Sequence, residues 1–188
     1  MASDDRIING CKKGKRRAFS LLYEKYADVL MLVCLRYSRN KAEAQDVLQE
    51  GFIKVFQKIE AFEGRGSFEG WLKRIMVNTA LNYYKANKKY QLQQDIEANN
   101  NILVIHDNDD EMFETDPRVK PEVLMQMIND LPDGYRMVFN MYVFDGLTHK
   151  EIAGDLGVTE STSKSQLSKA RKYLRSRIEE KQNKPVKA

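Results

Sequence analysis

Asparagine and cationic side chains recur on one side of the segment that follows Ser67. At about 100° per residue of helix, Arg74, Asn78 and Asn82 share a side, and Lys85 continues it. Amides can hydrogen-bond to base edges, and cations can hold phosphates. The chemistry predicted for this side is therefore nucleic-acid binding, although a merely solvated helix face remains the alternative.

The loop before this segment combines glycines with flanking aromatic residues. Arg65 and Ser67 stand beside Gly64 and Gly66, where backbone can approach a ligand or simply turn. The aromatic rings could stack on unpaired bases, each stack contributing about 1–3 kcal/mol, or fill the core. For Phe68 and Trp71 the sequence favours the core. The rings considered are Phe62, Phe68, Trp71, Tyr83 and Tyr84.

The segment from residue 40 to 59 carries carboxylates instead. Its outer side holds Asp46, Gln49, Glu50 and Ile53, opposite an apolar stripe. DNA phosphates repel carboxylates, so this side is predicted to bind a basic protein partner, unless it is only solvated.

The second half of the sequence contains a helix-turn-helix pattern. Thr148 and Glu151 form the spacing of a capping box, Gly157 permits a tight turn, and Thr159 or Ser161 caps the next helix. That helix begins with hydroxyls and amides and continues with cations, which suits the major groove. The residues predicted to face DNA are Ser161, Thr162, Lys164, Ser165, Gln166, Lys169 and Arg171. An ordinary amphipathic bundle helix is the alternative.

Helical periodicity dominates the chain, which predicts an all-α protein of two small helical domains. The predicted helices cover residues 18–37, 40–59, 68–90, 122–130, 134–144, 148–156 and 161–180. Between residues 91 and 120, eight carboxylates stand against two cations and apolar periodicity is lost. The predicted domains are residues 1–92 and 121–188, joined by a flexible acidic linker at 93–120.

The composition gives little support for an enzyme or a metal protein. Cys11, Cys34, His106 and His149 show no metal-ligand or nucleophile grouping, so no cofactor, metal or small-molecule substrate is expected. No apolar run approaches the ~18 residues needed to cross a bilayer, and no export signal precedes Asp4. We expect a cytoplasmic protein without direct membrane insertion.

The order of several short motifs resembles the extracytoplasmic-function (ECF) sigma factors of the sigma-70 family. The motifs resembling their domain two are KG at 13–14, AF at 18–19, LY at 22–23, AQDVLQEGF at 44–52 and FEGWLKRIMVNTA at 68–80. The motifs resembling their domain four are LP at 131–132, GLT at 146–148, EIA at 151–153 and AR at 170–171. Ser163 departs from the pattern, because the family usually has an apolar residue there.

The resemblance implies a factor that binds core RNA polymerase and directs promoter-specific initiation without being an enzyme. It implies that Asp46, Gln49, Glu50 and Ile53 dock on the clamp helices of the β′ subunit. Domain four would bind the minus-thirty-five element and the β flap, and an anti-sigma factor would control the protein. The residues implied in minus-ten DNA binding are Phe62, Arg65, Ser67, Arg74, Asn78, Asn82 and Lys85.

Two other classes of protein are the alternatives to a sigma factor. A free-standing helix-turn-helix repressor or activator would bind a two-fold operator alone, whereas a sigma factor forms a one-to-one complex with core polymerase. An enzyme is the third class, and the carboxylate pairs on solvated helix faces give it no support.

Overall fold

A computed structural model of the chain describes residues 3–94 and 119–182. Within these two ranges all regular elements are helices, which confirms the predicted all-α class. The chain divides into two compact units, Met1–Gln94 and Asp95–Ala188, and each is described by itself. Most of the predicted linker lies outside the described residues.

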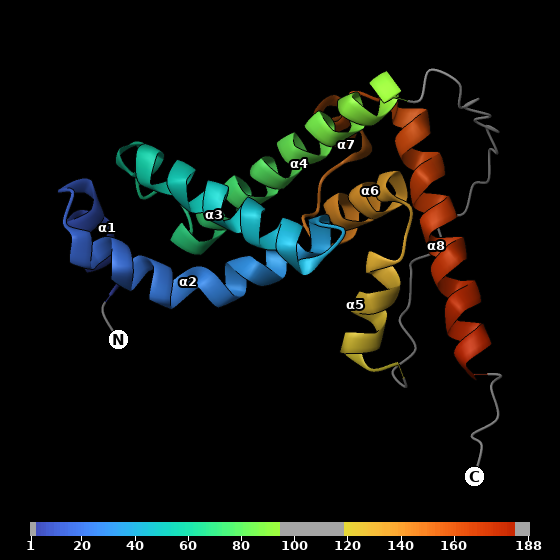
Figure 1. Ribbon diagram of the computed structural model, residues 1–188, viewed down its shortest axis with the longest axis horizontal. Coiled ribbons are helices and arrows are strands. Elements are labelled where there is room, and N and C mark those ends of the chain that lie inside the picture. The colour runs from blue at the N-terminus through green and yellow to red at the C-terminus, as the bar shows by residue number, and fades with distance from the viewer. Residues whose placement is uncertain (1–2, 95–118, 183–188) are drawn as a thin grey trace, which may run out of the picture. The chain divides into compact units, whose positions relative to one another are not determined.

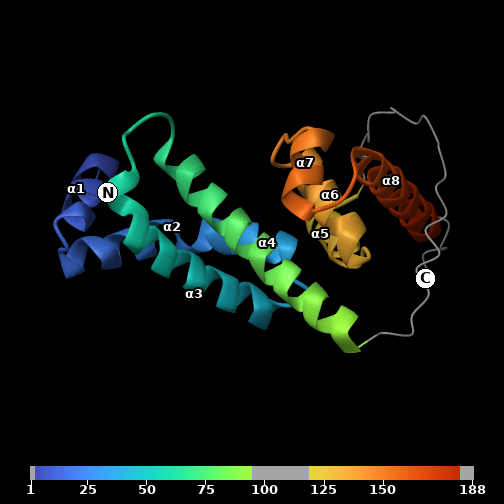
Figure 2. The same cartoon turned by 90° about the horizontal axis from the view of Figure 1, so that it is seen from above.

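The first unit is built on three long helices that pack on one another in pairs: α2 (Arg16–Tyr37), α3 (Lys41–Lys58) and α4 (Phe68–Gln94). Figures 1 and 2 show α3 and α4 lying side by side over α2. A short 3-10 turn, η1 (Ile59–Ala61), follows α3. The core side chains contributed by the three helices include Leu22, Leu30, Val47, Val55, Leu72 and Met76.

An additional helix, α1 (Asp4–Lys12), packs against α2 and η1. The sequence did not predict it, because nine residues with three buried apolar side chains, Ile7, Ile8 and Cys11, give too short a periodic signal. α1 approaches α2 closely at Gly10, where an added Cβ would lie 2.5 Å from the Cβ of Ala18.

The start of α3 follows from its capping residues. The Glu43 amide donates to the Asn40 side chain at 2.9 Å, as the sequence predicts. The Glu43 carboxylate in turn accepts from the Arg39 amide at 2.9 Å. These bonds fix where the helix begins, and with it the direction in which each α3 side chain points.

The second unit holds α5 (Pro121–Asn129), α6 (Asp133–Val143), α7 (His149–Leu156) and α8 (Glu160–Gln182). α8 packs against each of the other three helices. Arg136 is buried, pairs with Asp133 at 2.8 Å and donates to the carbonyl oxygens of Asn129 and Leu131, which joins α6 to the end of α5.

No helix in residues 3–94 or 119–182 combines the length and the apolar character needed to cross a membrane.

The close approach at Gly10 yields a stability prediction. Gly10→Ala should lower the free energy of unfolding of the first unit by about 1–2 kcal/mol, because overpacking costs about 1–3 kcal/mol and alanine's helix propensity returns at most ~1 kcal/mol. Urea denaturation followed by the fluorescence of Trp71, the chain's one tryptophan, measures this unit.

Two variants complete the test. Gly70→Ala should not destabilise, since its Cβ would meet only Ser67 at an ordinary 3.6 Å. Adding Ala18→Gly to Gly10→Ala should restore part of the lost stability. If Gly10→Ala alone were as stable as the wild type, α1 and α2 would not pack as tightly at Gly10 as described.

Candidate protein-binding and nucleic-acid interfaces

The outer side of α3 brings together the four residues predicted to contact a basic protein partner. Asp46, Gln49, Glu50 and Ile53 are all exposed, and Ile53 keeps 49% of its surface accessible. Glu50 pairs with Lys54 one turn later at 2.6 Å, an exposed ion pair that contributes little to stability. The face is therefore carboxylate-bearing with an apolar residue at its edge.

A groove of about 540 Å³ lies beside this face, between α2 and α3. Its lining is mostly apolar and consists of Tyr23, Met31, Gln45, Leu48, Gln49, Phe52, Ile53 and Phe56. Helical periodicity over residues 18–37 predicts Tyr23 on the buried side of its helix, which is wrong: its ring contacts Phe52 at 4.8 Å, yet 49% of the residue is exposed. Leu32 on α2 is 64% exposed. The sequence held a signal for this exposure: residues 18–37 contain more apolar positions than one buried side of a helix can hold.

Four of the predicted nucleic-acid contacts lie on α4. Arg74, Asn78, Asn82 and Lys85 are exposed along this helix, as the helical spacing predicts. The buried residues of α4, among the side chains that the structure describes, are Phe68, Leu72, Met76, Val77, Thr79, Ala80 and Leu81. Helical spacing predicts that Trp71, Leu72, Ile75, Thr79 and Tyr83 pack inward, and the sequence favours the core for Phe68; of these, Phe68, Leu72 and Thr79 are buried. The expected inward residues Trp71, Ile75 and Tyr83 are half-buried instead.

The loop between η1 and α4 exposes Arg65 and Ser67. Gly64 and Gly66 have φ values of +76° and +86°, a region that strongly favours glycine. Arg65 pairs with Glu63 at 3.0 Å, and the Ser67 hydroxyl accepts from the Gly70 amide at 3.2 Å. Ser67 thus caps α4 in addition to lying on the exposed loop.

The Phe62 ring is buried, with 6% of the residue exposed, in a cluster with Phe68 and Trp71. The ring centroids of Phe62 lie 5.0 Å from Phe68 and 5.4 Å from Trp71. The Lys12 ammonium donates to the Phe62 carbonyl oxygen at 2.7 Å. Phe62 therefore holds the loop against the core, and its ring offers no free stacking surface.

The helix-turn-helix pattern is present in the second unit. Thr148 and Glu151 form the predicted capping box, and Gly157 adopts a left-handed conformation with φ +66°. Of the two residues considered for the next cap, Thr159 accepts from the Thr162 amide at 3.0 Å. The turn between α7 and α8 thus follows from local hydrogen bonds and one glycine.

The predicted DNA-facing residues of α8 divide by burial. Ser161 and Lys164 are exposed, whereas Thr162, Ser165, Gln166, Lys169 and Arg171 are half-buried. The Gln166 carboxamide lies against Gly134 of α6, where an added Cβ would be 3.1 Å from its Nε2 atom. The Arg171 guanidinium lies 5.8 Å from the centre of the Tyr142 ring.

Ser163 is fully buried and ties the two helices of the motif together. Its hydroxyl lies 2.9 Å from Nδ1 of His149, and the His149 ring stacks on Tyr142 at 4.8 Å. An apolar residue at 163 could pack there but could not form this bond. The bond fixes the rotation of α8 relative to the start of α7.

Neither cysteine is placed for chemistry. Cys11 and Cys34 are buried free thiols, and burial raises the pKa of both, that of Cys34 to about 12. In the described ranges no three histidine, cysteine or carboxylate side chains are grouped to hold a metal ion. His106 lies outside those ranges.

Comparison with known proteins relates both units to one family. Models named Sigma-70 region 2 and Sigma-70 region 4 match residues 22–90 and 122–174. The chain is 31% identical over 185 residues to the RNA polymerase sigma-H factor of Pseudomonas aeruginosa, covering 91% of each protein. It is 30% identical to the ECF RNA polymerase sigma-E factor of Haemophilus influenzae, covering 94% of this chain and 96% of that one.

Among solved structures, the chain is similar to the sigma factor RpoE in complex with the anti-sigma factor NepR from Bartonella quintana. The identity is 20%, the coverage is 86% of this chain and 96% of that one, and the TM-score is 0.50. This likeness concerns the fold.

The buried hydroxyl of Ser163 gives a prediction for the second unit. Ser163→Ala should destabilise α7 and α8 by about 1 kcal/mol, because a buried hydrogen bond is lost. Hydrogen exchange of the amides in the two helices measures the effect separately from the first unit. Ser161→Ala, the same change at an exposed position of α8, should alter exchange by less than ~0.5 kcal/mol. Equal protection in both variants would show that the contact to His149 contributes nothing.

Proposed function

Because this chain belongs to the ECF sigma factors of the sigma-70 family, we propose that α3 binds core RNA polymerase while α4 and α8 bind promoter DNA. Sigma factors direct transcription initiation and are not enzymes. The observation that carries the assignment is the separation of charge within the first unit: carboxylates on the outer side of α3, and cations with amides on α4.

The α3 face suits a large basic partner, which we identify as the β′ clamp helices. Asp46 and Glu50 offer carboxylates on one exposed side, and Ile53 forms an apolar edge beside the groove. Charge complementarity sets orientation and on-rate, while burial of apolar groups supplies affinity. Tyr23, which lines the groove, extends the proposed docking surface onto α2.

The loop and α4 suit a melted minus-ten element. Arg65 and Arg74 are exposed cations that would hold phosphates, and Asn78 and Asn82 are exposed amides that would contact base edges. Trp71 is half-buried and is the member of the aromatic cluster with accessible surface for a base. Taking a base out of the stack costs a few kcal/mol, which binding in a pocket can offset without nucleotide hydrolysis.

The second unit suits double-stranded DNA at the minus-thirty-five element. The N-terminal end of α8 exposes Ser161 and Lys164, and this is the end that enters the major groove in helix-turn-helix proteins. At the end of α6, Tyr142, Val143 and Phe144 are exposed apolar residues. This patch is our candidate for docking the β flap.

An anti-sigma factor fits the same surfaces. The Bartonella relative of similar fold was solved with such a partner. By covering the α3 face and the adjoining groove, an inhibitor of this kind would block polymerase binding. A protein that works with polymerase in this way acts in the bacterial cytoplasm.

The α3 assignment is tested by reversing charge. Asp46→Lys with Glu50→Lys should weaken the one-to-one complex with core polymerase about 100-fold or more, since facing like charges costs several kcal/mol. Competition binding measures the affinity, and circular dichroism should show unchanged helix content.

The matched control is Glu24→Lys with Asp28→Lys, which makes the same change at the same spacing on exposed positions of α2. It should retain core binding. An equal loss in both variants would mean that overall charge, rather than the α3 face, governs binding. Failure of the wild-type chain to bind core polymerase would overturn the proposed function itself.

The α8 assignment is tested on promoters with and without a minus-thirty-five element. Lys164→Ala with Gln166→Ala should lower run-off transcription only where the element is present, by about 5–100-fold. Of the single variants, Lys164→Ala should have the larger effect, because Gln166 lies against Gly134. An equal loss on promoters lacking the element would contradict the assignment.

A further inference from the structure

The hairpin of α1 and α2 carries a cationic pocket that takes no part in the contacts assigned above. Resting on the proposed function, we propose that this pocket binds backbone phosphates of the melted promoter strand, next to the segment held by the loop at residues 62–67. The ligand class is single-stranded DNA, recognised by charge and not by base sequence.

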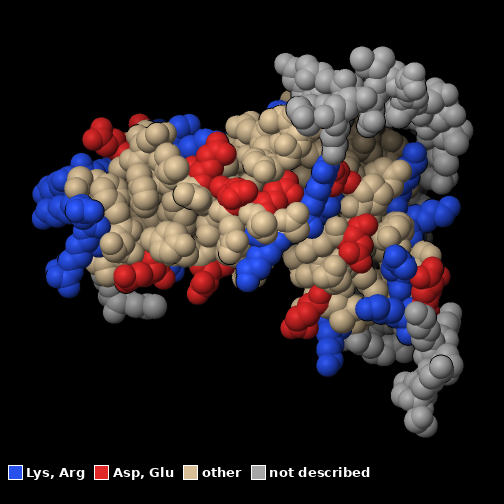
Figure 3. Space-filling model, in the orientation of Figure 1, with Lys and Arg blue, Asp and Glu red and all other residues tan. Residues whose placement is uncertain are grey.

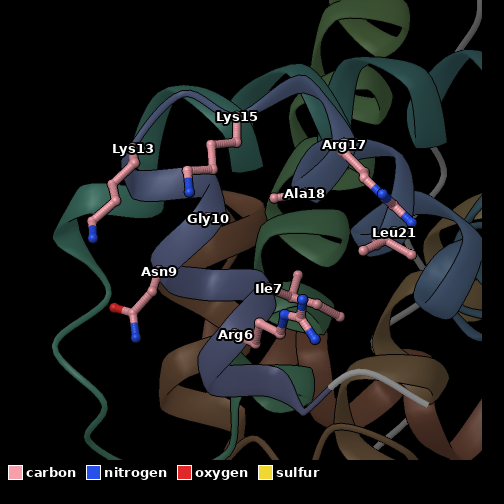
Figure 4. Close-up of a pocket in the computed structure, with 9 residues that line it drawn as sticks. All are labelled: Arg6, Ile7, Asn9, Gly10, Lys13, Lys15, Arg17, Ala18 and Leu21. Atoms are coloured by element: carbon pink, nitrogen blue, oxygen red, sulfur yellow. The ribbon is translucent and has the colours of Figure 1, made fainter.

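The pocket has a volume of about 770 Å³ and lies between α1, the turn after it and the first turns of α2. Its lining combines four cations with an amide and no carboxylate. The residues are Arg6, Ile7, Asn9, Gly10, Lys13, Lys15, Arg17, Ala18 and Leu21. Figure 4 shows the cationic side chains coming from both helices and from the turn between them.

The backbone fixes this arrangement of cations. Gly14 has φ +66°, and the Lys15 amide donates to the Gly10 carbonyl oxygen at 3.0 Å, so Lys13 and Lys15 lie on either side of a tight turn. The contact of Gly10 with Ala18 keeps Arg6 and Arg17 on neighbouring helices. The cations therefore do not depend on a ligand to be brought together.

The charge of the pocket is not neutralised from within the unit. In the described ranges no carboxylate forms an ion pair with Arg6, Lys13, Lys15 or Arg17. Asp4 on α1 accepts instead from Lys25 and from the Tyr26 hydroxyl, each at 2.6 Å. These hydrogen bonds lower the pKa of Asp4 and hold its carboxylate against Lys25 and Tyr26 of α2, which do not line the pocket. Figure 3 shows the resulting gathering of Lys and Arg at this end of the unit.

The pocket adjoins the loop proposed to hold melted DNA. Lys12, the last residue of α1, donates to the Phe62 carbonyl oxygen at 2.7 Å, and α1 packs on η1. A strand that leaves the loop on this side meets the cations of the α1–α2 turn. The cations are spread around an open surface, which suits successive phosphates of a chain better than one small anion.

The test uses holoenzyme reconstituted from the full chain and core polymerase, with a promoter whose minus-ten segment is already unpaired. Lys13→Gln with Lys15→Gln should weaken binding several-fold at moderate salt. The slope of log affinity against log salt should fall by up to about 1.4, at ~0.7 per single-strand phosphate contact. Lys41→Gln with Lys181→Gln removes the same charge at exposed positions elsewhere and should leave the slope unchanged.

Other outcomes overturn the inference while sparing the proposed function. An unchanged salt slope in the pocket variant, with normal holoenzyme formation, would mean that no phosphate binds there. Weaker holoenzyme formation in that variant would assign the pocket to an acidic protein surface. If millimolar pyrophosphate competed for the wild-type protein but not for the pocket variant, and the two bound DNA with equal affinity, the pocket would be a small-anion site. Only failure of the wild type to form holoenzyme would remove the proposed function as well.

Discussion

The crossing of α3 and α4 at Gly51 is the constraint on which the first unit depends. A Cβ at Gly51 would overlap the thioether of the buried Met76 side chain, so a larger residue at position 51 would force Met76 to shift. With the stripes around Gly51 and Met76 buried against each other, the opposite sides must face solvent. The carboxylates of α3 and the cations of α4 are thereby held on separate surfaces of one small bundle.

The sequence predicted what local chemistry determines. Asn40 and Thr148 cap their helices as expected, and the turn at Gly157 has the expected left-handed conformation. The sequence-based predictions were wrong where tertiary packing determines the structure. The short helix α1 carries too few apolar residues for its periodicity to show, and the expected end of α4 at residue 90 was short of Gln94. Helix caps and hydrophobic periodicity are local properties of the sequence, whereas the packing of one helix on another depends on residues far apart in the chain.

The same limit applies to individual site residues. All four α3 positions are exposed as expected, since one helical period fixes their common side. The Phe62 ring instead belongs to the aromatic cluster with Phe68 and Trp71, and Gln166 lies against Gly134 on another helix. Helical periodicity does not predict either contact. For Tyr23, the excess of apolar positions on residues 18–37 indicates that some of them stay exposed, but not which ring borders a groove.

The burial of both cysteines has a consequence for how such a factor could receive signals. Reaction with peroxides or exchange with disulfides requires an accessible thiolate, and the thiols of Cys11 and Cys34 are enclosed and held protonated at neutral pH. Oxidative stress therefore has no direct chemical target among the thiols of this chain. If its regulon answers to such a stress, a sensing thiol must belong to another molecule.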